Sequence, residues 1–193
     1  MARTIIDVAT YILERTGTVT TMKLQKLAFY SQAQHLAQYG SSLFPEDFEA
    51  WRGGPVAPEL YALHRGMFLI RPGELPSSDS STLTDAERGL IDSVCSALGG
   101  MTGAELSERT HLESPWLDAR EGLAPSDPSN AVITQEAMHS YYLEHPVLLD
   151  CLTVPHCSGT AMATRTIAGQ GLKRIRSSSP ADDDRETRQN RAS

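Results

Sequence analysis

Apolar residues recur at helical spacing in six segments of this 193-residue chain, separated by stretches rich in Gly, Pro and Ser. Within residues 4–15, for example, Ile5, Val8 and Ile12 fall on one face of a helix, and Gly17 follows where a helix C-cap is typical. The predicted helices comprise residues 4–15, 20–40, 59–66, 84–98, 102–110 and 134–144. This spacing predicts a mainly α fold.

Two short regions favour extended structure instead. The helical period is lost over residues 43–58, where Phe48 and Ala50 point to a short strand and Gly53-Gly54-Pro55 predicts a turn. Val132-Ile133 is expected to add a second short strand. The predicted loops are residues 71–82 and 121–130. We therefore expect a compact single domain of about six helices with a minor β element.

The composition of the chain changes near residue 145. Residues 1–145 hold most of the large apolar side chains and are long enough to form one domain. Residues 146–193 begin with a short apolar stretch, VLLDCLTV, and continue into Ser, Thr, Arg, Asp and Gly. Because such a sequence buries too little apolar surface to offset the entropy lost on ordering, residues 158–193 are predicted to be disordered.

The charge changes at the same point. Residues 1–145 carry 10 Lys and Arg against 19 Asp and Glu, a net charge of −9, whereas residues 146–193 carry 7 against 5, a net charge of +2. An acidic domain repels a phosphate backbone, which argues against nucleic acid as the partner.

Cysteine content and hydropathy point to the cytoplasm as the compartment. Cys95, Cys151 and Cys157 are an odd number without the spacing of a disulfide framework, and no signal segment is recognisable. No apolar run reaches the roughly 18 residues needed to span a membrane. A membrane partner is therefore not expected.

The six histidines do not form a convincing catalytic or metal site. His111 and Glu113 are two positions apart and would point to different sides of a helix, and no pair has the spacing of zinc ligands. Cys95 lies on the apolar stripe of its predicted helix and is better explained as a small core residue. We expect no metal, no cofactor and no enzymatic activity. A hydrolase site around His64, His111 and Glu113 stays open as a minor alternative.

Three sequence blocks are more specific than the helical pattern. They are KLQKLAFYSQA at residues 23–33, FEAWRGGPVAPELY at residues 48–61, and LSERTHLESPW at residues 106–116, followed by Ala119-Arg120. In this order and at these separations they resemble the Panacea domain, which is also met as the SocA-like or phage-associated GepA-like antitoxin domain. The resemblance covers about residues 5–145.

The resemblance implies a mostly helical domain that neutralises a toxin encoded by a neighbouring gene through direct protein contact. In the SocA-like case it also implies an adaptor that delivers the toxin to a cytoplasmic protease. A DNA-binding autoregulator of the operon is the alternative, because small helical proteins often place a helix in the major groove.

The motif residues divide into two predicted groups. The candidate partner-binding residues have long or aromatic side chains in or beside the blocks: Tyr30, Arg52, Tyr61 and Arg120. The structural motif residues are Lys23, Gln25, Trp51, Gly54, Pro55 and Trp116. Trp51 and Trp116 are expected to be buried, and Lys23 and Lys26 are expected to face solvent or to pair with the surplus carboxylates.

Overall fold

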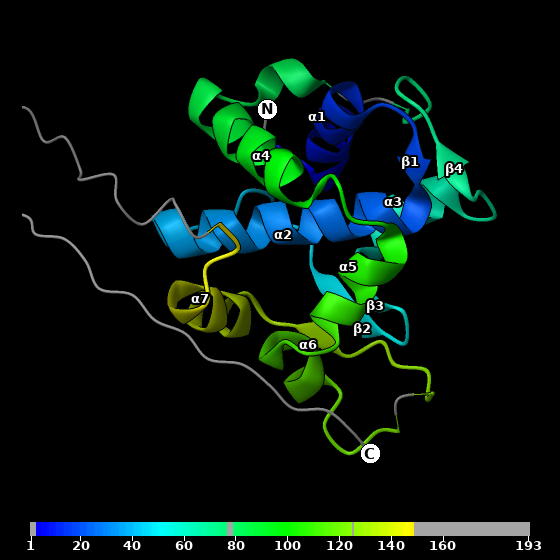
Figure 1. Cartoon of the computed structure of the whole chain (residues 1–193), viewed down its shortest axis with the longest axis vertical. Coiled ribbons are helices and arrows are strands. Elements are labelled where there is room, and N and C mark those ends of the chain that lie inside the picture. The colour runs from blue at the N-terminus through cyan, green and yellow to red at the C-terminus, as the bar shows by residue number, and fades with distance from the viewer. Residues whose placement is uncertain (1–2, 77–78, 125, 149–193) are drawn as a thin grey trace, which may run out of the picture. The chain divides into compact units, whose positions relative to one another are not determined.

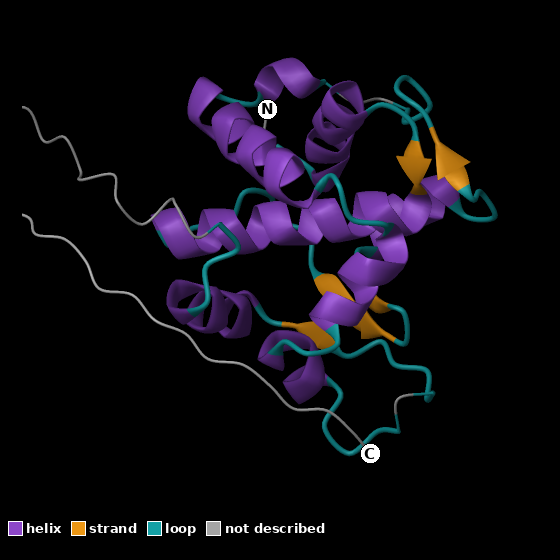
Figure 2. Ribbon diagram, viewed as in Figure 1, coloured by secondary structure: helices purple, strands orange, loops and turns teal. Residues whose placement is uncertain are grey.

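The computed structural model describes residues 3–76, 79–124 and 126–148, and these residues form a mainly helical domain (Figures 1 and 2). Their helices are α1 (Ile5–Thr16), α2 (Thr21–Tyr39), α3 (Pro58–His64), α4 (Asp85–Leu98), α5 (Gly103–Thr110), α6 (Ser114–Ala119) and α7 (Gln135–Glu144), with a single 3-10 turn at Ser80–Thr82. The mainly α prediction is confirmed. The predicted disordered tail, residues 158–193, lies outside the described residues.

Local capping explains where several helices begin. Thr4, Thr84 and Thr102 each accept a hydrogen bond from the backbone of the third residue of the helix, and the side chain of that residue bonds back to the cap. This reciprocal arrangement satisfies backbone donors that have no partner within the helix.

Helix α6 was not predicted. It is only six residues long, too short to show a helical period, and it begins with Pro115 in its first turn. Pro115 and Trp116 are its buried residues, so packing of one large ring fixes this helix rather than a repeating pattern.

The strands are short and pair antiparallel. Strands β1 (Val19–Thr20) and β4 (Leu69–Ile70) form one ladder, and β2 (Phe48–Trp51) lies between β3 (Gly54–Val56) and β5 (Val132–Ile133) in the other. In the second sheet Ala50 pairs with Pro55 and Phe48 pairs with Ile133. The predicted strands at 48–50 and 132–133 therefore belong to one sheet. The hairpin turns at Arg52-Gly53, one residue earlier than predicted, because Gly54 and Pro55 are already paired with β2 as part of β3.

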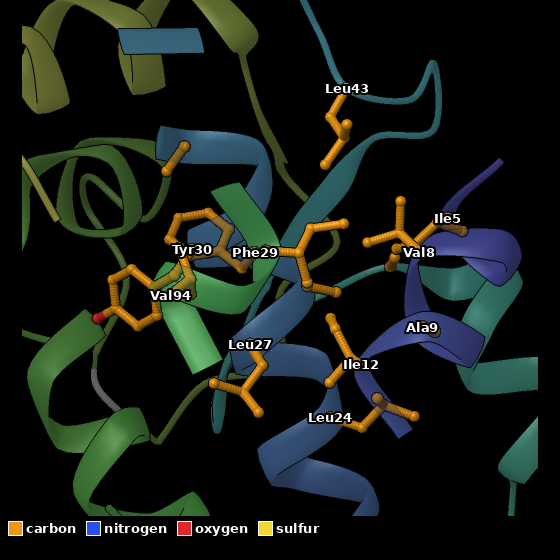
Figure 3. Packing of buried hydrophobic residues seen from close by; sticks show 14 of the residues in the cluster. Ile5, Val8, Ala9, Ile12, Leu24, Leu27, Phe29, Tyr30, Leu43 and Val94 are labelled. Atoms are coloured by element: carbon orange, nitrogen blue, oxygen red, sulfur yellow. The ribbon is translucent and has the colours of Figure 1, made fainter. Parts of the chain in front are cut away.

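Helix α2 is the centre of the domain. Figure 1 shows it between α1 and α4 on one side and α5, α6 and α7 on the other, and every residue from Leu24 to Leu36 is buried. Figure 3 shows side chains of α1 and α2 in the apolar cluster that forms the core. Neighbouring elements therefore cover this helix on all sides.

The chain remains packed on the domain after α7. Val147 and Leu148 are both buried and belong to the core cluster, although the sequence had placed them in a linker. Apolar side chains just outside a predicted helix can still fill a gap in the core, and periodicity does not detect them.

Candidate functional site

The polar residues of α2 tie irregular segments to the core. Gln32 donates to the Phe44 carbonyl at 2.9 Å and accepts from the Leu43 amide at 2.7 Å, and His35 Nδ1 lies 2.7 Å from the Ser41 carbonyl. Each bond satisfies a polar group that would be costly to bury alone.

Gln25 uses its whole side-chain amide in the same way. Its Nε2 donates to the Ala57 carbonyl at 3.3 Å, and its Oε1 accepts from the Ala57 amide at 3.0 Å. Its Nε2 is also 3.1 Å from His64 Nε2, which burial holds in the neutral form by lowering the pKa of this histidine. Gln25 therefore joins α2 to the residue before α3 and to the last residue of that helix.

The two lysines of the first block do not behave as the sequence predicted. Lys23 donates to the carbonyl of Gly99, which follows the C-terminus of α4, at 2.6 Å, where a cation complements the helix dipole. Lys26 is only 1% exposed and donates to the Pro55 carbonyl at 2.9 Å. Burial lowers the pKa of Lys26 to about 7, because the charged form loses its hydration. The expectation that Lys26 faces solvent or a carboxylate was wrong.

The hairpin turn is held by α2 and α5 together. Gly54 has a φ of 91°, which favours glycine, and a Cβ there would lie 2.7 Å from Thr110 Oγ1 and 2.8 Å from Lys26 Cε. Ser107 Oγ donates to the Gly53 carbonyl at 2.7 Å. A side chain at position 54 would therefore disturb the packing of β3 against α2 and α5.

A buried carboxylate links α2 to α7. Glu113 Oε2 accepts from the Tyr30 hydroxyl at 3.0 Å and from the Tyr142 hydroxyl at 2.6 Å. Its Oε1 accepts from Arg109 Nε at 3.2 Å, and the Arg109 guanidinium lies 4.8 Å from the Tyr30 ring centre. Burial and the adjacent Glu113 charge raise the pKa of Tyr30, so its hydroxyl stays a donor.

This network removes Tyr30 from the candidate partner surface, because its side chain is fully buried in the free domain. The sequence had placed it there on the ground that it is a large aromatic in a motif block.

The ring of Trp116 is also part of the core. Its indole N–H donates to the Trp51 carbonyl at 3.0 Å, and its ring stacks on His111 with the ring centres 4.2 Å apart. The guanidinium of Arg120 lies 4.9 Å from the Trp116 ring centre and donates to the Ala50 carbonyl at 2.8 Å. Trp116 is buried as predicted, and Arg120, only 5% exposed, holds β2 in place instead of facing a partner.

Three motif residues do reach the surface near the hairpin. Trp51 and Tyr61 are partly exposed and meet edge to face with ring centres 4.8 Å apart, and Arg52 is exposed at the turn. The Trp51 indole N–H donates to Glu49 at 2.6 Å. Of the two tryptophans, only Trp116 is fully in the core as expected.

Two cavities border this surface. A cavity of about 790 Å³ is lined by Glu49, Trp51 and Arg52 and by residues of the loop that precedes β5. A smaller pocket of about 200 Å³ is also lined by Trp51 and reaches Gln25, Lys26 and His64. We define the partly exposed Trp51 and Tyr61 and the exposed Arg52, with these two cavities, as the hairpin surface.

The groups considered for catalysis have structural partners. His64 bonds to Gln25, His111 stacks on Trp116 and Glu113 accepts from two tyrosines. Cys95 packs against the core, and burial raises the pKa of its thiol to about 11. Among residues 3–76, 79–124 and 126–148, no group of three or more His, Cys, Asp or Glu is arranged to hold a metal ion. Within the same residues, no helix is long and apolar enough to cross a membrane.

The sequence offered one signal of these buried contacts that was missed. Helix α2 has 19 residues but only two charged ones, Lys23 and Lys26, and several of its polar residues are glutamines. A long helix with so few charges is typical of one that is buried on every side.

Comparison with family models found a match for part of the chain. Residues 24–117 match the model described as "Antitoxin SocA-like, Panacea domain". The matched segment begins in α2 and ends in α6, so it contains the hairpin and nearly all of the three sequence blocks. Comparisons with curated proteins and with solved structures found no match.

Proposed function

Since residues 24–117 match the family model of the SocA-like Panacea antitoxin domain, we propose that this protein neutralises a cognate toxin in the cytoplasm by binding it directly. The toxin would be the product of a neighbouring gene. The observation that carries this proposal is the family match, because it spans most of the motif residues that build the domain.

The distribution of the motif residues supports binding rather than turnover. Several polar groups at the centre of the domain are occupied by structural hydrogen bonds, as Gln25 and Glu113 illustrate. The hairpin surface, in contrast, presents an aromatic pair beside an exposed arginine. Aromatic rings and arginines are the side chains that most often contribute large binding energies at protein interfaces.

The decisive experiment titrates the purified protein against the product of the neighbouring gene. A binder must occupy nearly every toxin molecule, so toxin activity should disappear near a one-to-one ratio. In bacteria, growth rescue should fail once expression of the toxin exceeds that of this protein. Neutralisation at far lower ratios would indicate an enzyme, and absence of a complex would refute the proposal.

Variants at the hairpin surface locate the contact. Arg52→Ala and Tyr61→Ala should weaken the complex by about tenfold or more each, while the melting temperature changes little. Glu136→Ala, at an exposed position on α7, is the matched control and should bind as the wild type does. Equal affinities for all three variants would place the contact elsewhere.

The same purified protein tests the two finer roles. Faster degradation of the toxin by a cytoplasmic protease in its presence would support the adaptor role. Duplex DNA from the operon should bind weakly at physiological salt, because residues 1–145 carry a net charge of −9. Tight, sequence-specific binding of DNA would favour the autoregulator instead.

A further inference from the structure

The smaller pocket combines apolar walls with a buried amine. Its volume is about 200 Å³, and Met22, Trp51 and Tyr61 are among its walls. Lys26 and His64 also line it, although their exposed fractions are only 1% and 3%. An apolar pocket with a few fixed polar groups is the usual form of a specific binding site.

Lys26, which lines this pocket, has hydrogen-bond donors that are not used within the domain. A protonated amine has three N–H donors, and Lys26 Nζ makes one hydrogen bond, to the Pro55 carbonyl. None of the ion pairs within the described part of the chain includes Lys26. Burial makes the charged form of this amine unfavourable, and a carboxylate that entered the pocket would stabilise that form by pairing with it.

We infer that this pocket receives an acidic side chain of the partner protein, whose carboxylate pairs with Lys26 and whose methylene groups contact Met22 and Trp51. Charge-assisted hydrogen bonds of this kind are about twice as strong as neutral ones. The identity of the partner as a toxin rests on the proposed function, but the chemistry of the pocket does not.

The surroundings of the pocket favour a protein as the source of the carboxylate. The exposed apolar side chains of Met67, Phe68 and Leu69 follow α3. They adjoin the pocket because Thr21, which lines it, donates from its backbone amide to the Phe68 carbonyl at 3.0 Å. Phe68 is 77% exposed, and exposed apolar groups that gather beside a pocket are typical of protein contact surfaces.

The first test uses the unchanged full-length protein and two small probes of the same shape. Pentanoate carries the carboxylate, and pentanamide is its uncharged counterpart. The indole N–H resonance of Trp51 reports occupancy of the pocket. A hydrogen bond to a charged group contributes about 1.5–3 kcal/mol, so pentanoate should bind roughly 10 to 100 times more tightly than pentanamide. Equal affinities, or no binding of pentanoate, would overturn the inference.

Variants then assign the binding to the pocket. Lys26→Met keeps the length of the side chain and should abolish the preference for pentanoate. Gly53→Leu should block binding of both probes without disturbing the fold, because a Cβ at Gly53 meets nothing closer than Met22 Cε at 4.0 Å. Arg65→Ala removes an exposed cation that does not line the pocket and should leave the preference unchanged. If Arg65→Ala abolishes the preference and Lys26→Met does not, the carboxylate binds elsewhere and the inference is wrong.

Capped peptides distinguish a protein-borne carboxylate from a free one. Acetyl-Leu-Glu-Leu-amide should bind more tightly than acetyl-Leu-Gln-Leu-amide, and Gly53→Leu should remove the difference. Binding of pentanoate without a preference between the peptides would make this a site for a small free carboxylate and would refute the assignment to a partner protein. None of these measurements uses the toxin, so a negative result would leave the proposed neutralisation standing. If the protein prefers the glutamate peptide but does not neutralise the toxin, only the proposed function is refuted.

Discussion

Removal of the Glu113 carboxylate should destabilise the domain strongly, because this one side chain holds three helices together. In Glu113→Ala, the hydroxyls of Tyr30 and Tyr142 lose their charged acceptor while both rings stay buried. Each buried hydroxyl left without a partner costs about 1–3 kcal/mol, and Arg109 loses its partially screened ion pair. We expect a loss of about 3–5 kcal/mol in the free energy of unfolding, which is a large fraction of the stability of an ordinary domain.

Urea unfolding followed by circular dichroism measures this loss. Glu108→Ala, at an exposed position on the same helix as Arg109, is the matched control and should change stability by less than about 0.5 kcal/mol. In a double-mutant cycle, Tyr142→Phe should cost less in the Glu113→Ala background than in the wild type, because the hydroxyl then has no acceptor to lose. A loss below about 1 kcal/mol for Glu113→Ala, or strict additivity in the cycle, would refute the network as described.

Three further predictions test the packing around α2. Gly54→Ala should lower the free energy of unfolding by at least about 2 kcal/mol, because a Cβ there meets Thr110 Oγ1 at 2.7 Å and φ is 91°. Gly53→Ala should be nearly neutral in the same thermal or urea unfolding. Equal effects of the two changes would contradict the close approach at Gly54. Burial lowers the pKa of Lys26 to about 7, below its ordinary value of 10.5. The unfolded chain therefore binds more protons between these pH values, and stability should rise with pH across this window. From pH 7 to pH 9 the wild type should gain about 2 kcal/mol relative to Lys26→Met in urea unfolding, and parallel pH profiles would show that the amine is not desolvated. Trp116→Ala should lower the free energy of unfolding by about 3–5 kcal/mol and Trp51→Ala by clearly less, since of these two rings only that of Trp116 is almost fully buried. Equal melting temperatures for the two variants would contradict this ranking.

Local features of the sequence were sufficient for most of the helices. The cap residues Thr4, Thr84 and Thr102 and the helical spacing act over only a few residues, so the positions of α1, α4 and α5 could be predicted within a residue or two. The short strands at 48–50 and 132–133 were also recognised, but their union in one sheet depends on pairing between positions about 85 residues apart.

The candidate site was predicted less well than the helices. Arg52 and Tyr61 reach the surface, whereas Tyr30 and Arg120 are buried in contacts to Glu113 and to the Ala50 carbonyl. Long polar and aromatic side chains occur both in the core and at the surface, so residue type alone does not predict which of the two they occupy.

The sequence by itself determined which segments become helices, and the tertiary structure decided which of their faces are buried. Helical spacing is a short-range property, and it correctly predicted a long helix from residue 20 or 21 to about residue 40. Whether Lys26 and Tyr30 face solvent depends on the β2–β3 hairpin, α5 and α7, which cover that helix from distant parts of the chain. Burial of a polar side chain is stable only where such distant elements supply its hydrogen-bond partners, so it is a property of the assembled fold.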